Sequence, residues 1–294
     1  MRIVITGANG MLARAAIKHC TSGGDDVIAF TRGDLDIAER DSVLGTIGEI
    51  RPDAVINCAA FTDVDGAETN AAASYSANSA GVENLAEACR TIDAAFVTVS
   101  TDYVFDGAKS GFYTQRDTPK PQGVYAKSKR QGEIGAFSGY PRSIIVRSGW
   151  IFGNGGTNFL SVMQGLLAEG KAIKAIHDSY GTPTFADDLA KRLRELAAAD
   201  LPGVYHVTNT GEGTSYFGFA EKICELGGFD KGLLQPTSHA ELERPAPRPV
   251  SSKLACLISE KLGFAPMRKW EDALAEFISQ QKRGQARLPD LRIL

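Results

Sequence analysis

Short apolar runs alternate with helical patterns over the first half of the chain. Runs rich in β-branched residues and bounded by glycine or polar residues are typical of buried strands, and here they cover 2–6, 26–31, 53–57, 95–100 and 143–147. The segments between them predict helices over 13–18, 39–50, 69–91 and 124–137, and a long loop over 106–123. Strands that alternate with helices imply a parallel sheet covered on both faces. We therefore expect an α/β fold with a Rossmann-type, doubly wound parallel sheet.

The first strand leads into a glycine turn and then a helix, with the spacing G-x-x-G-x-x-A. Gly7 allows a tight turn, Gly10 lets the backbone approach a ligand, and the small Ala13 lets helix and strand pack closely. Backbone N–H groups and a helix N-terminus then meet at one point, which favours a pyrophosphate. We predict a dinucleotide site here, with an ordinary tight turn as the alternative. Its contacts are expected from Gly7, Asn9, Gly10, Met11 and Leu12.

The end of the second strand bears on the choice between NAD and NADP. An acidic residue there bonds the ribose 2′-hydroxyl, whereas a basic residue suits the 2′-phosphate. Arg32 favours NADPH, while Asp34 and Asp36 keep NADH open as a cofactor. A solvated turn residue is the alternative interpretation of Arg32. Asp36 and Ile37 are expected to flank the adenine.

Tyr125 and Lys129 stand four residues apart, so on a helix they share one face. An ammonium group beside a phenol lowers the phenol pKa and makes it a usable proton donor near neutral pH. The hydroxyl of Thr101, at the end of a predicted strand, would complete a catalytic group. The alternative is that Tyr125 packs in the core and Lys129 lies on a solvated helix face.

After residue 150 the pattern is less regular. It predicts helices over 158–169, 185–199 and 269–282, and short strands over 171–177 and 204–207. Prolines exclude a helix over 243–250, and the tail 283–294 is expected to be a surface extension. We predict an NAD(P)-binding Rossmann domain over 1–150, to which later segments return, and a smaller, mainly substrate-binding C-terminal lobe over 151–294.

Composition narrows the function further. The chain has 294 residues, 43% of them hydrophobic, and a formal net charge of −3, so it lacks the basic excess of a nucleic-acid-binding protein. No apolar stretch approaches the roughly 20 residues of a membrane span. Five scattered cysteines without a C-x-x-C pair and the absence of a signal-peptide pattern favour a reducing cytoplasm. Four histidines without ligand spacing predict no metal site.

The chain also resembles a known family, the dTDP-4-dehydrorhamnose reductases of the extended short-chain dehydrogenase/reductase superfamily. Its most specific motif is Ser-Thr-Asp-Tyr-Val-Phe-Asp-Gly over 100–107. The other motifs that carry the likeness, in the order of the family, are Cys-Ala-Ala-Phe-Thr-Asp-Val-Asp over 58–65, Tyr-Ala-Lys-Ser-Lys over 125–129, Arg-Ser-Gly-Trp-Ile-Phe-Gly over 147–153, Asn-Phe at 158–159, Asp-Ser-Tyr-Gly-Thr-Pro-Thr over 178–184 and Arg-Pro-Val-Ser-Ser-Lys-Leu over 248–254.

This resemblance implies a role for individual residues. Thr101, Tyr125 and Lys129 match the catalytic group. Residues that match the lining of the sugar pocket are Thr62, Val64, Thr101, Asp102, Tyr103, Tyr125 and Trp150, with Asn158 and Arg248 near the nucleotide or diphosphate. Cofactor contacts are also expected from Cys58, Ala59, Ala60, Thr62, Ser100, Tyr125 and Lys129. A core aromatic and a free surface arginine are the alternatives for Trp150 and Arg248.

The implied reaction is NADPH-dependent reduction of the 4-keto group of a dTDP-4-keto-6-deoxy sugar, dTDP-4-dehydro-L-rhamnose to dTDP-L-rhamnose, by a monomer or homodimer. The chain departs from the family pattern at Asp63, Ser179 and Ser251, where a small apolar residue, glutamine and asparagine are usual. These departures keep open another nucleotide-linked 4-keto sugar. A second alternative is a non-catalytic, NADP-binding regulatory subunit like that of methionine adenosyltransferase, against which the intact catalytic group argues.

Overall fold

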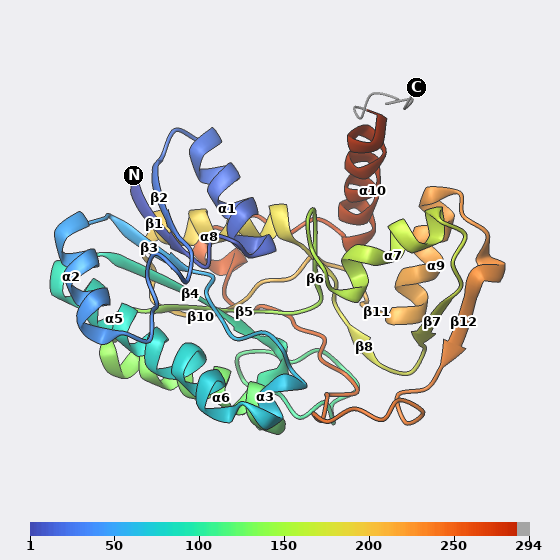
Figure 1. Cartoon of the computed structure of the whole chain (residues 1–294), viewed down its shortest axis with the longest axis horizontal. Helices are drawn as coiled ribbons and strands as arrows, with labels where there is room; N and C mark the ends of the chain where they lie inside the picture. The colour runs from blue at the N-terminus through green and yellow to red at the C-terminus, as the bar shows by residue number, and fades with distance from the viewer. Residues whose placement is uncertain (287–294) are drawn as a thin grey trace.

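A computed structural model describes residues 1–286 and has a six-stranded parallel sheet at its centre (Figure 1). The strands lie in the order β10-β5-β4-β3-β1-β2. Their bounds are β1 (Arg2–Thr6), β2 (Asp26–Phe30), β3 (Ala54–Asn57), β4 (Ala95–Thr101), β5 (Ile144–Ser148) and β10 (Gly203–His206). All are parallel to their neighbours, which confirms the predicted α/β class and the strands predicted over the first half.

Helices cover both faces of this sheet, because successive strand residues point to opposite sides. Ile3 and Ile5 lie in a core with the two helices on one face, whereas Val4 packs toward the other face. The first pair of helices is α1 (Met11–Ser22) and α8 (Ala186–Ala199). The opposite face is covered by α2 (Arg40–Ile50), α5 (Gly81–Ile92) and α6 (Gly123–Gly139).

A second lobe lies beside the sheet, at the right of Figure 1. It contains α7 (Phe159–Ala168), α9 (Tyr216–Gly227) and α10 (Trp270–Ala286), with β7 (Ile173–Ile176) paired to β12 (Leu234–Thr237). Its core is largely aromatic, with Phe152, Phe185, Phe219, Trp270 and Phe277 buried together. Two further pairs of short strands form: β6 (Ile151–Phe152) with β9 (Thr184–Phe185), and β8 (Tyr180–Gly181) with β11 (Thr214–Ser215).

The helices predicted over 158–169, 185–199 and 269–282 are confirmed, and no helix forms over 243–250. Helix α9 and strand β12 were not predicted, although the Ser215 hydroxyl caps α9 by accepting from the Gly218 N–H at 3.0 Å. Helix α10 continues through 283–286, and the rest of the predicted tail extension lies outside the described residues. The domain division at residue 150 stays a prediction, since α8 and β10 both belong to the core of the large sheet.

The single helix predicted over 69–91 is wrong. Asn70, at φ −121° and ψ 47°, separates α3 (Gly66–Thr69) from α4 (Ala71–Tyr75). A π-helical turn, Ser76–Ala80, then joins α4 to α5. Such turns shift the side-chain register, which periodicity alone does not reveal.

The π-helical turn packs directly against α6. A Cβ at Gly132 would lie 2.0 Å from the Asn78 carbonyl oxygen, so α6 approaches this turn more closely than a side chain would allow. Gly135 and Gly139 extend the same contact along α5, against Glu83. The three glycines therefore give α6 a flat face for close helix packing.

The sheet contains the switch in strand order that is typical of doubly wound folds. Strand β1 pairs with β2 on one side and with β3 on the other. The chain therefore leaves β1 for α1 on one face of the sheet and leaves β3 for the helices on the other face. Gly7 follows β1 with φ +74°, and a Cβ there would lie 2.7 Å from the Ala59 amide nitrogen. Only glycine fits this crossing without strain.

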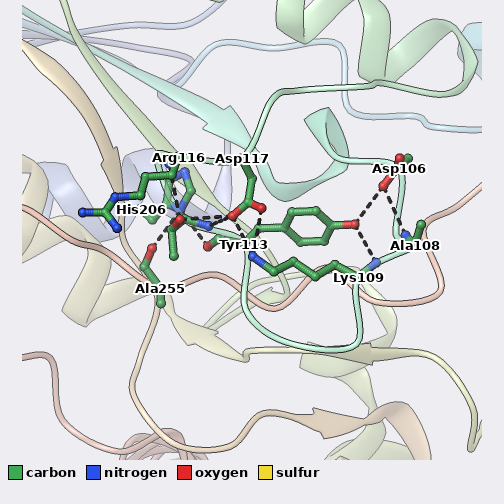
Figure 2. Close-up of polar contacts among 9 residues, drawn as sticks. Asp106, Ala108, Lys109, Tyr113, Arg116, Asp117, His206 and Ala255 are labelled. Atoms are coloured by element: carbon green, nitrogen blue, oxygen red, sulfur yellow. Dashed lines mark hydrogen bonds and ion pairs between the residues drawn. The ribbon is translucent and has the colours of Figure 1, made fainter.

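A long loop, as predicted, follows β4 and the short 3-10 turn Asp102–Val104. Figure 2 shows how its side chains fasten it: the Tyr113 hydroxyl donates to Asp106 Oδ1 at 2.8 Å, and Lys109 Nζ donates to Asp117 Oδ1 at 2.8 Å. The loop therefore has an internal polar framework.

The loop is also joined to the sheet edge through His206. Its Nδ1 lies 3.2 Å from the Tyr113 carbonyl oxygen and 3.0 Å from that of Ala255, so Nδ1 carries a proton (Figure 2). Its Nε2 lies 3.4 Å from Arg147 Nη1 and acts as an acceptor. Burial lowers the pKa of His206 to about 4, and the Arg147 charge acts in the same direction.

We predict that His206 makes the free energy of unfolding fall as the pH is lowered from its unfolded pKa of about 6.5 to its folded pKa of about 4. In that window the unfolded chain binds the extra proton, so up to about 3 kcal/mol is lost, and above the window the term is constant. Urea unfolding across pH should show a shallower fall for His206→Gln. His177→Gln, at an exposed position, should keep the wild-type slope; equal slopes in all three proteins would contradict the prediction.

We also predict that Gly7→Ala lowers the free energy of unfolding by about 2 to 4 kcal/mol, because it adds backbone strain and a clash with Ala59. Gly24→Ala is the matched control, since Gly24 has φ +83° but open space around its Cα. That variant should lose only about 1 kcal/mol in the same urea titration. Equal losses would show that the contact with Ala59 has no part in the effect.

Candidate active site

A cavity of about 240 Å³ opens at the switch in strand order. Its lining includes seven residues predicted to bind the cofactor: Gly7, Asn9, Arg32, Asp36, Ile37, Ala59 and Ala60. The sequence did not indicate the other lining residues, Leu35, Phe61, Ala73 and Ala77. The last two come from the broken helical region, whose register the periodicity did not give.

The glycine turn at this cavity fits the phosphates of a dinucleotide. The Gly10 N–H donates to the Gly7 carbonyl at 2.8 Å, and Gly10 is the N-cap of α1. The turn is tight, because a Cβ at Gly7 would collide with the backbone at Ala59. The Leu12 side chain is buried in the sheet core, so only its backbone is available to a ligand.

The first turn of α1 also contacts the second lobe. Arg14 donates to the carbonyl oxygens of Asn9 and Gly155, the latter at 2.8 Å. The Ser161 hydroxyl lies 3.6 Å from the Met11 sulfur. The glycine turn is therefore held between the sheet and the segment that leads into α7.

The segment after β2 places the exposed side chain of Arg32 beside two acidic residues. Asp34 Oδ2 accepts from the Thr31 N–H at 2.9 Å and from its hydroxyl at 2.6 Å. Asp36 accepts from Arg32 Nε at 3.1 Å and from the Ala38 N–H at 3.1 Å. Both carboxylates thus have partners in the chain, while the Arg32 side chain is 83% exposed.

Four of the predicted site residues meet at the end of β4. The Thr101 hydroxyl donates to Asp102 Oδ1 at 3.0 Å and accepts from the Tyr103 N–H at 3.1 Å. The Tyr103 ring stands edge-on to that of Tyr125, with centroids 6.0 Å apart. Burial raises the pKa of Tyr125 to about 12, hydrogen bonding with Thr101 opposes the shift, and the Asp102 charge adds to it.

The expected lowering of the Tyr125 pKa by Lys129 is therefore not found. Lys129 is only 5% exposed and its ammonium donates to the Val99 carbonyl at 2.7 Å, at the end of the sheet. Burial lowers the pKa of Lys129 to about 8, while the Glu133 carboxylate and Cys58 act in the opposite direction. In the protein alone, burial outweighs the attraction on which the sequence prediction rested.

Asp102 is buried beside the catalytic group. A Cβ at Gly149 would lie 2.2 Å from its carboxyl carbon, so glycine makes room for this side chain at the end of β5. Burial raises the pKa of Asp102 to about 6, while hydrogen bonds from Ser252 and Thr101 oppose the shift. Asp102 can therefore change its charge within the pH range in which enzymes commonly act.

An aromatic row leads from the catalytic group toward the second lobe. Trp150, in the left-handed region at φ +51°, stacks on Tyr216 with ring centroids 3.9 Å apart. Tyr216, at the start of α9, lies near enough to Tyr103 for hydrogen bonding between them to oppose the rise that burial causes in the Tyr216 pKa. Trp150 is partly buried and packs against the aromatic core of the second lobe, so its place in the sugar pocket stays a prediction. The sequence did not point to Tyr216, because it did not predict α9.

Arg248 is not a free surface arginine, because it is paired with an acidic residue. Its Nη1 and Nη2 donate to the two carboxylate oxygens of Asp65 at 2.8 and 2.7 Å. Its charge also acts on Tyr103 and Tyr216. The pair joins the proline-rich segment to the loop after β3, beside the aromatic row.

Other predicted site residues have their polar groups engaged within the chain. Asn158 caps α7 by accepting from the Ser161 N–H at 3.0 Å, and its amide donates to the Ile151 carbonyl at 2.8 Å. The Ser100 hydroxyl donates to Glu133 Oε1 at 2.7 Å. Thr62 is exposed and Val64 is partly buried, and both follow the cavity residue Phe61 in the sequence that leads to Asp65. Cys58 is partly buried after β3.

Asn78 is a further residue that the sequence did not single out. Its amide nitrogen donates to the Phe61 carbonyl and to the Ser128 hydroxyl, both at 3.0 Å, and its amide oxygen accepts from the Phe61 N–H at 2.9 Å. The π-helical turn places this side chain between the cofactor loop and α6. It fixes the position of the helix that carries Tyr125.

The three departures from the family pattern have local partners or surroundings. Asp63 accepts from the Gly66 N–H at 2.8 Å, at the start of α3. The Ser179 hydroxyl lies 3.1 Å from His239 Nδ1. Ser251 is buried beside β8, to which it forms a bridge at Tyr180.

Two further observations concern the described residues as a whole. Within 1–286, no cluster of three or more histidine, cysteine or acidic side chains has the arrangement of a metal site. None of the helices in this part of the chain has the length and apolar character needed to cross a bilayer.

Known proteins resemble the chain along nearly its whole length. The model of the RmlD substrate binding domain family matches residues 1–283. A dTDP-4-dehydrorhamnose reductase from Mycobacterium tuberculosis is 39% identical over 99% of this chain and 98% of its own. A probable dTDP-4,6-dihydroxy-2-methyloxan-3-one 4-ketoreductase from Streptomyces antibioticus is 37% identical over 94% of each chain.

A solved structure has the same fold throughout. The dTDP-4-dehydrorhamnose reductase of Bacillus anthracis, in complex with NADP, superposes with a TM-score of 0.91 at 35% identity and covers 95% of this chain and 99% of its own. The chain belongs to the RmlD substrate binding domain family, which confirms the resemblance to the dTDP-4-dehydrorhamnose reductases.

Proposed function

We propose that this protein is an NADPH-dependent reductase of the 4-keto group of a dTDP-linked 6-deoxy sugar, with dTDP-4-dehydro-L-rhamnose as substrate and dTDP-L-rhamnose as product. One observation carries the proposal. Tyr125 and Thr101 come together at the end of β4, and the buried ammonium of Lys129 donates to a carbonyl of the same strand. The cofactor cavity lies at the neighbouring ends of β1, β2 and β3. A proton donor and a hydride source can then act on one carbonyl group.

In this mechanism, NADPH when bound supplies the hydride for the ketone carbon. Tyr125 gives its proton to the ketone oxygen, which becomes the hydroxyl of the product. Thr101 would hold that oxygen by a hydrogen bond once its hydroxyl proton turns away from Asp102. The pKa of about 12 means that Tyr125 carries its proton throughout the neutral range. Lys129 stabilises the phenolate that remains once the proton has left, since a positive charge favours it.

The cofactor would lie along the cavity from Arg32 to the glycine turn. The pyrophosphate would lie at the N-terminus of α1, which begins directly after the N-cap Gly10. Arg32 would face the 2′-phosphate, because its guanidinium is exposed while Asp34 is engaged by Thr31. Asp36 and Ile37 would lie beside the adenine, and Lys129 would bond the nicotinamide ribose.

The substrate would lie on the other side of the catalytic group. Tyr103, Trp150 and Tyr216 form an aromatic surface suited to a sugar ring. Arg248 suits a diphosphate, since its planar fork already binds the carboxylate of Asp65 in two places. Binding of the diphosphate would then take over part of the pairing with Asp65.

A different dTDP-linked 4-keto sugar is the second candidate substrate. Ser179 and Ser251 stand where the family pattern has larger amides, and Ser179 contacts His239. The relative from Streptomyces antibioticus is named as a 4-ketoreductase of another dTDP compound. The reaction chemistry would be the same for both substrates. We propose that the reaction takes place in the cytoplasm.

The direct test is oxidation of NADPH by the purified protein with dTDP-4-dehydro-L-rhamnose made in situ, with NADH in parallel. Rapid oxidation with formation of dTDP-L-rhamnose is the expected result. Turnover only with another dTDP-4-keto sugar would establish the second candidate. Cofactor binding without turnover of any such sugar would contradict the reductase proposal.

We predict that Tyr125→Phe lowers turnover by about 100-fold or more, because the proton donor is removed. Binding of NADPH, followed by fluorescence, should remain. Tyr140→Phe is the control, since Tyr140 is another buried tyrosine whose hydroxyl donates to Asp93 at 3.0 Å, away from the cavity. Near-full activity in Tyr125→Phe would show that the proton comes from another group.

We also predict that Arg32→Ser reduces the preference for NADPH over NADH by about tenfold, as one charge-assisted contact to the 2′-phosphate is lost. The ratio of kcat/KM for the two cofactors measures this preference. Arg90→Ser makes the same change of net charge at an exposed position on α5 and should leave the ratio unchanged. A ratio that does not move in either variant would remove Arg32 from the cofactor site.

A further inference from the structure

Glu133 is a buried carboxylate one helical turn beyond Lys129 on α6. Its side chain is only 1% exposed. Arg147 binds it in two places, with Nε 2.8 Å from Oε1 and Nη2 2.7 Å from Oε2. Arg130 Nη1 and the Ser100 hydroxyl each donate to it at 2.7 Å. A carboxylate with four such donors is held in one position and kept ionised.

The same carboxylate joins three elements at the base of the active site. Ser100 lies at the end of β4, next to Thr101, and Arg147 lies on β5. The ammonium of Lys129 donates to the carbonyl of Val99, the residue before Ser100. Glu133 therefore fixes the end of β4, where Thr101 lies. The Val99 carbonyl of the same strand end orients Lys129.

We propose that Glu133 is a positioning residue for the reduction: its carboxylate, held by Arg147, keeps the buried ammonium of Lys129 charged and aimed at the sheet end beside Tyr125. The inference rests on the proposed function for the role of Lys129. It adds a residue that does not touch the substrate but determines whether Lys129 has a charge to offer.

Glu133 is the carboxylate whose charge acts on Lys129. The groups that face this cluster are Arg130 on α6, Arg147 on β5, His206 on β10, Cys58 after β3 and Tyr125 on α6. His206 is neutral, since burial lowers its pKa to about 4. Burial likewise raises the pKa of Cys58 to about 12, so its thiol is uncharged near neutral pH.

Glu133 is thus the negative group that opposes the loss of charge by Lys129. Burial alone would raise the pKa of Glu133, but the hydrogen bonds and charge of Arg147, with Ser100 and Arg130, hold it below its ordinary value. Burial lowers the pKa of Lys129 to about 8, and Glu133 opposes that shift. Replacing the carboxylate by an amide would remove the negative charge that opposes the loss of the Lys129 proton.

The test measures the titration of Lys129 directly, without substrate or cofactor. Protein labelled with carbon-13 at the lysine ε-carbons is titrated by NMR from about pH 6 to about pH 10, and Lys129→Met assigns the signal. In Glu133→Gln, the Lys129 midpoint should fall by at least about one pH unit. Turnover near pH 8 should fall by about tenfold relative to turnover near pH 6, which a loss of folded protein alone would not produce.

Two further variants keep the test decisive. Glu133→Gln leaves a buried arginine unpaired and can fail to fold, so Glu133→Gln with Arg147→Met removes both charges together. The Lys129 midpoint should still fall in that double variant. Asp25→Asn breaks another buried pair, with Arg194 Nη2 at 2.9 Å, at the opposite end of β1 and β2 from the active site. It should leave the Lys129 midpoint in place.

A folded double variant in which the Lys129 midpoint equals that of the wild type would overturn the inference. An equal fall in Asp25→Asn would overturn it too, because the effect would then be general. The proposed function is judged separately, by wild-type turnover of the sugar. An inactive wild type would still show whether Glu133 controls the charge of Lys129.

Discussion

The close contact of α6 with the π-helical turn is the constraint on which the active site depends. Gly132 lets the Asn78 carbonyl approach the helix backbone, and the Asn78 amide holds Ser128 on the same helix. Tyr125 and Lys129 then face the end of β4 rather than solvent. A side chain at position 132 would push α6 outward and separate the phenol from Thr101, since a clash at 2.0 Å cannot be absorbed by small adjustments.

Burial in this cleft controls the chemistry as much as contact does. The same low-dielectric surroundings raise the pKa of Tyr125 and lower that of Lys129, so neither group has its ordinary value in the protein alone. Charged groups persist there only with partners, as Glu133 does with Arg147 and Asp65 with Arg248. The pair of Glu133 and Arg147 joins α6 to β5, and the pair of Asp65 and Arg248 lies beside the aromatic row.

Much of the fold followed from local patterns. Strands β1 to β5 and the glycine turn could be predicted, because buried parallel strands form short apolar runs and Gly7 follows the first of them. The second lobe was less predictable. Its core combines distant aromatic residues such as Phe152, Phe219 and Phe277, and no single segment shows that they meet. The break at Asn70 and the π-helical turn were also missed, because a one-residue shift of register leaves no clear periodic signal.

The sequence by itself determined the fold class, the family and the residue types of the candidate site, since motif spacing and strand-end position are local properties. Only the tertiary structure decided which groups share an environment. It paired Arg248 with Asp65, turned the Ser100 hydroxyl to Glu133 and brought Tyr216 to Trp150. It also reversed the expected shift in the pKa of Tyr125, because burial depends on everything packed around a side chain, whereas a spacing of four residues specifies only its neighbour on the helix.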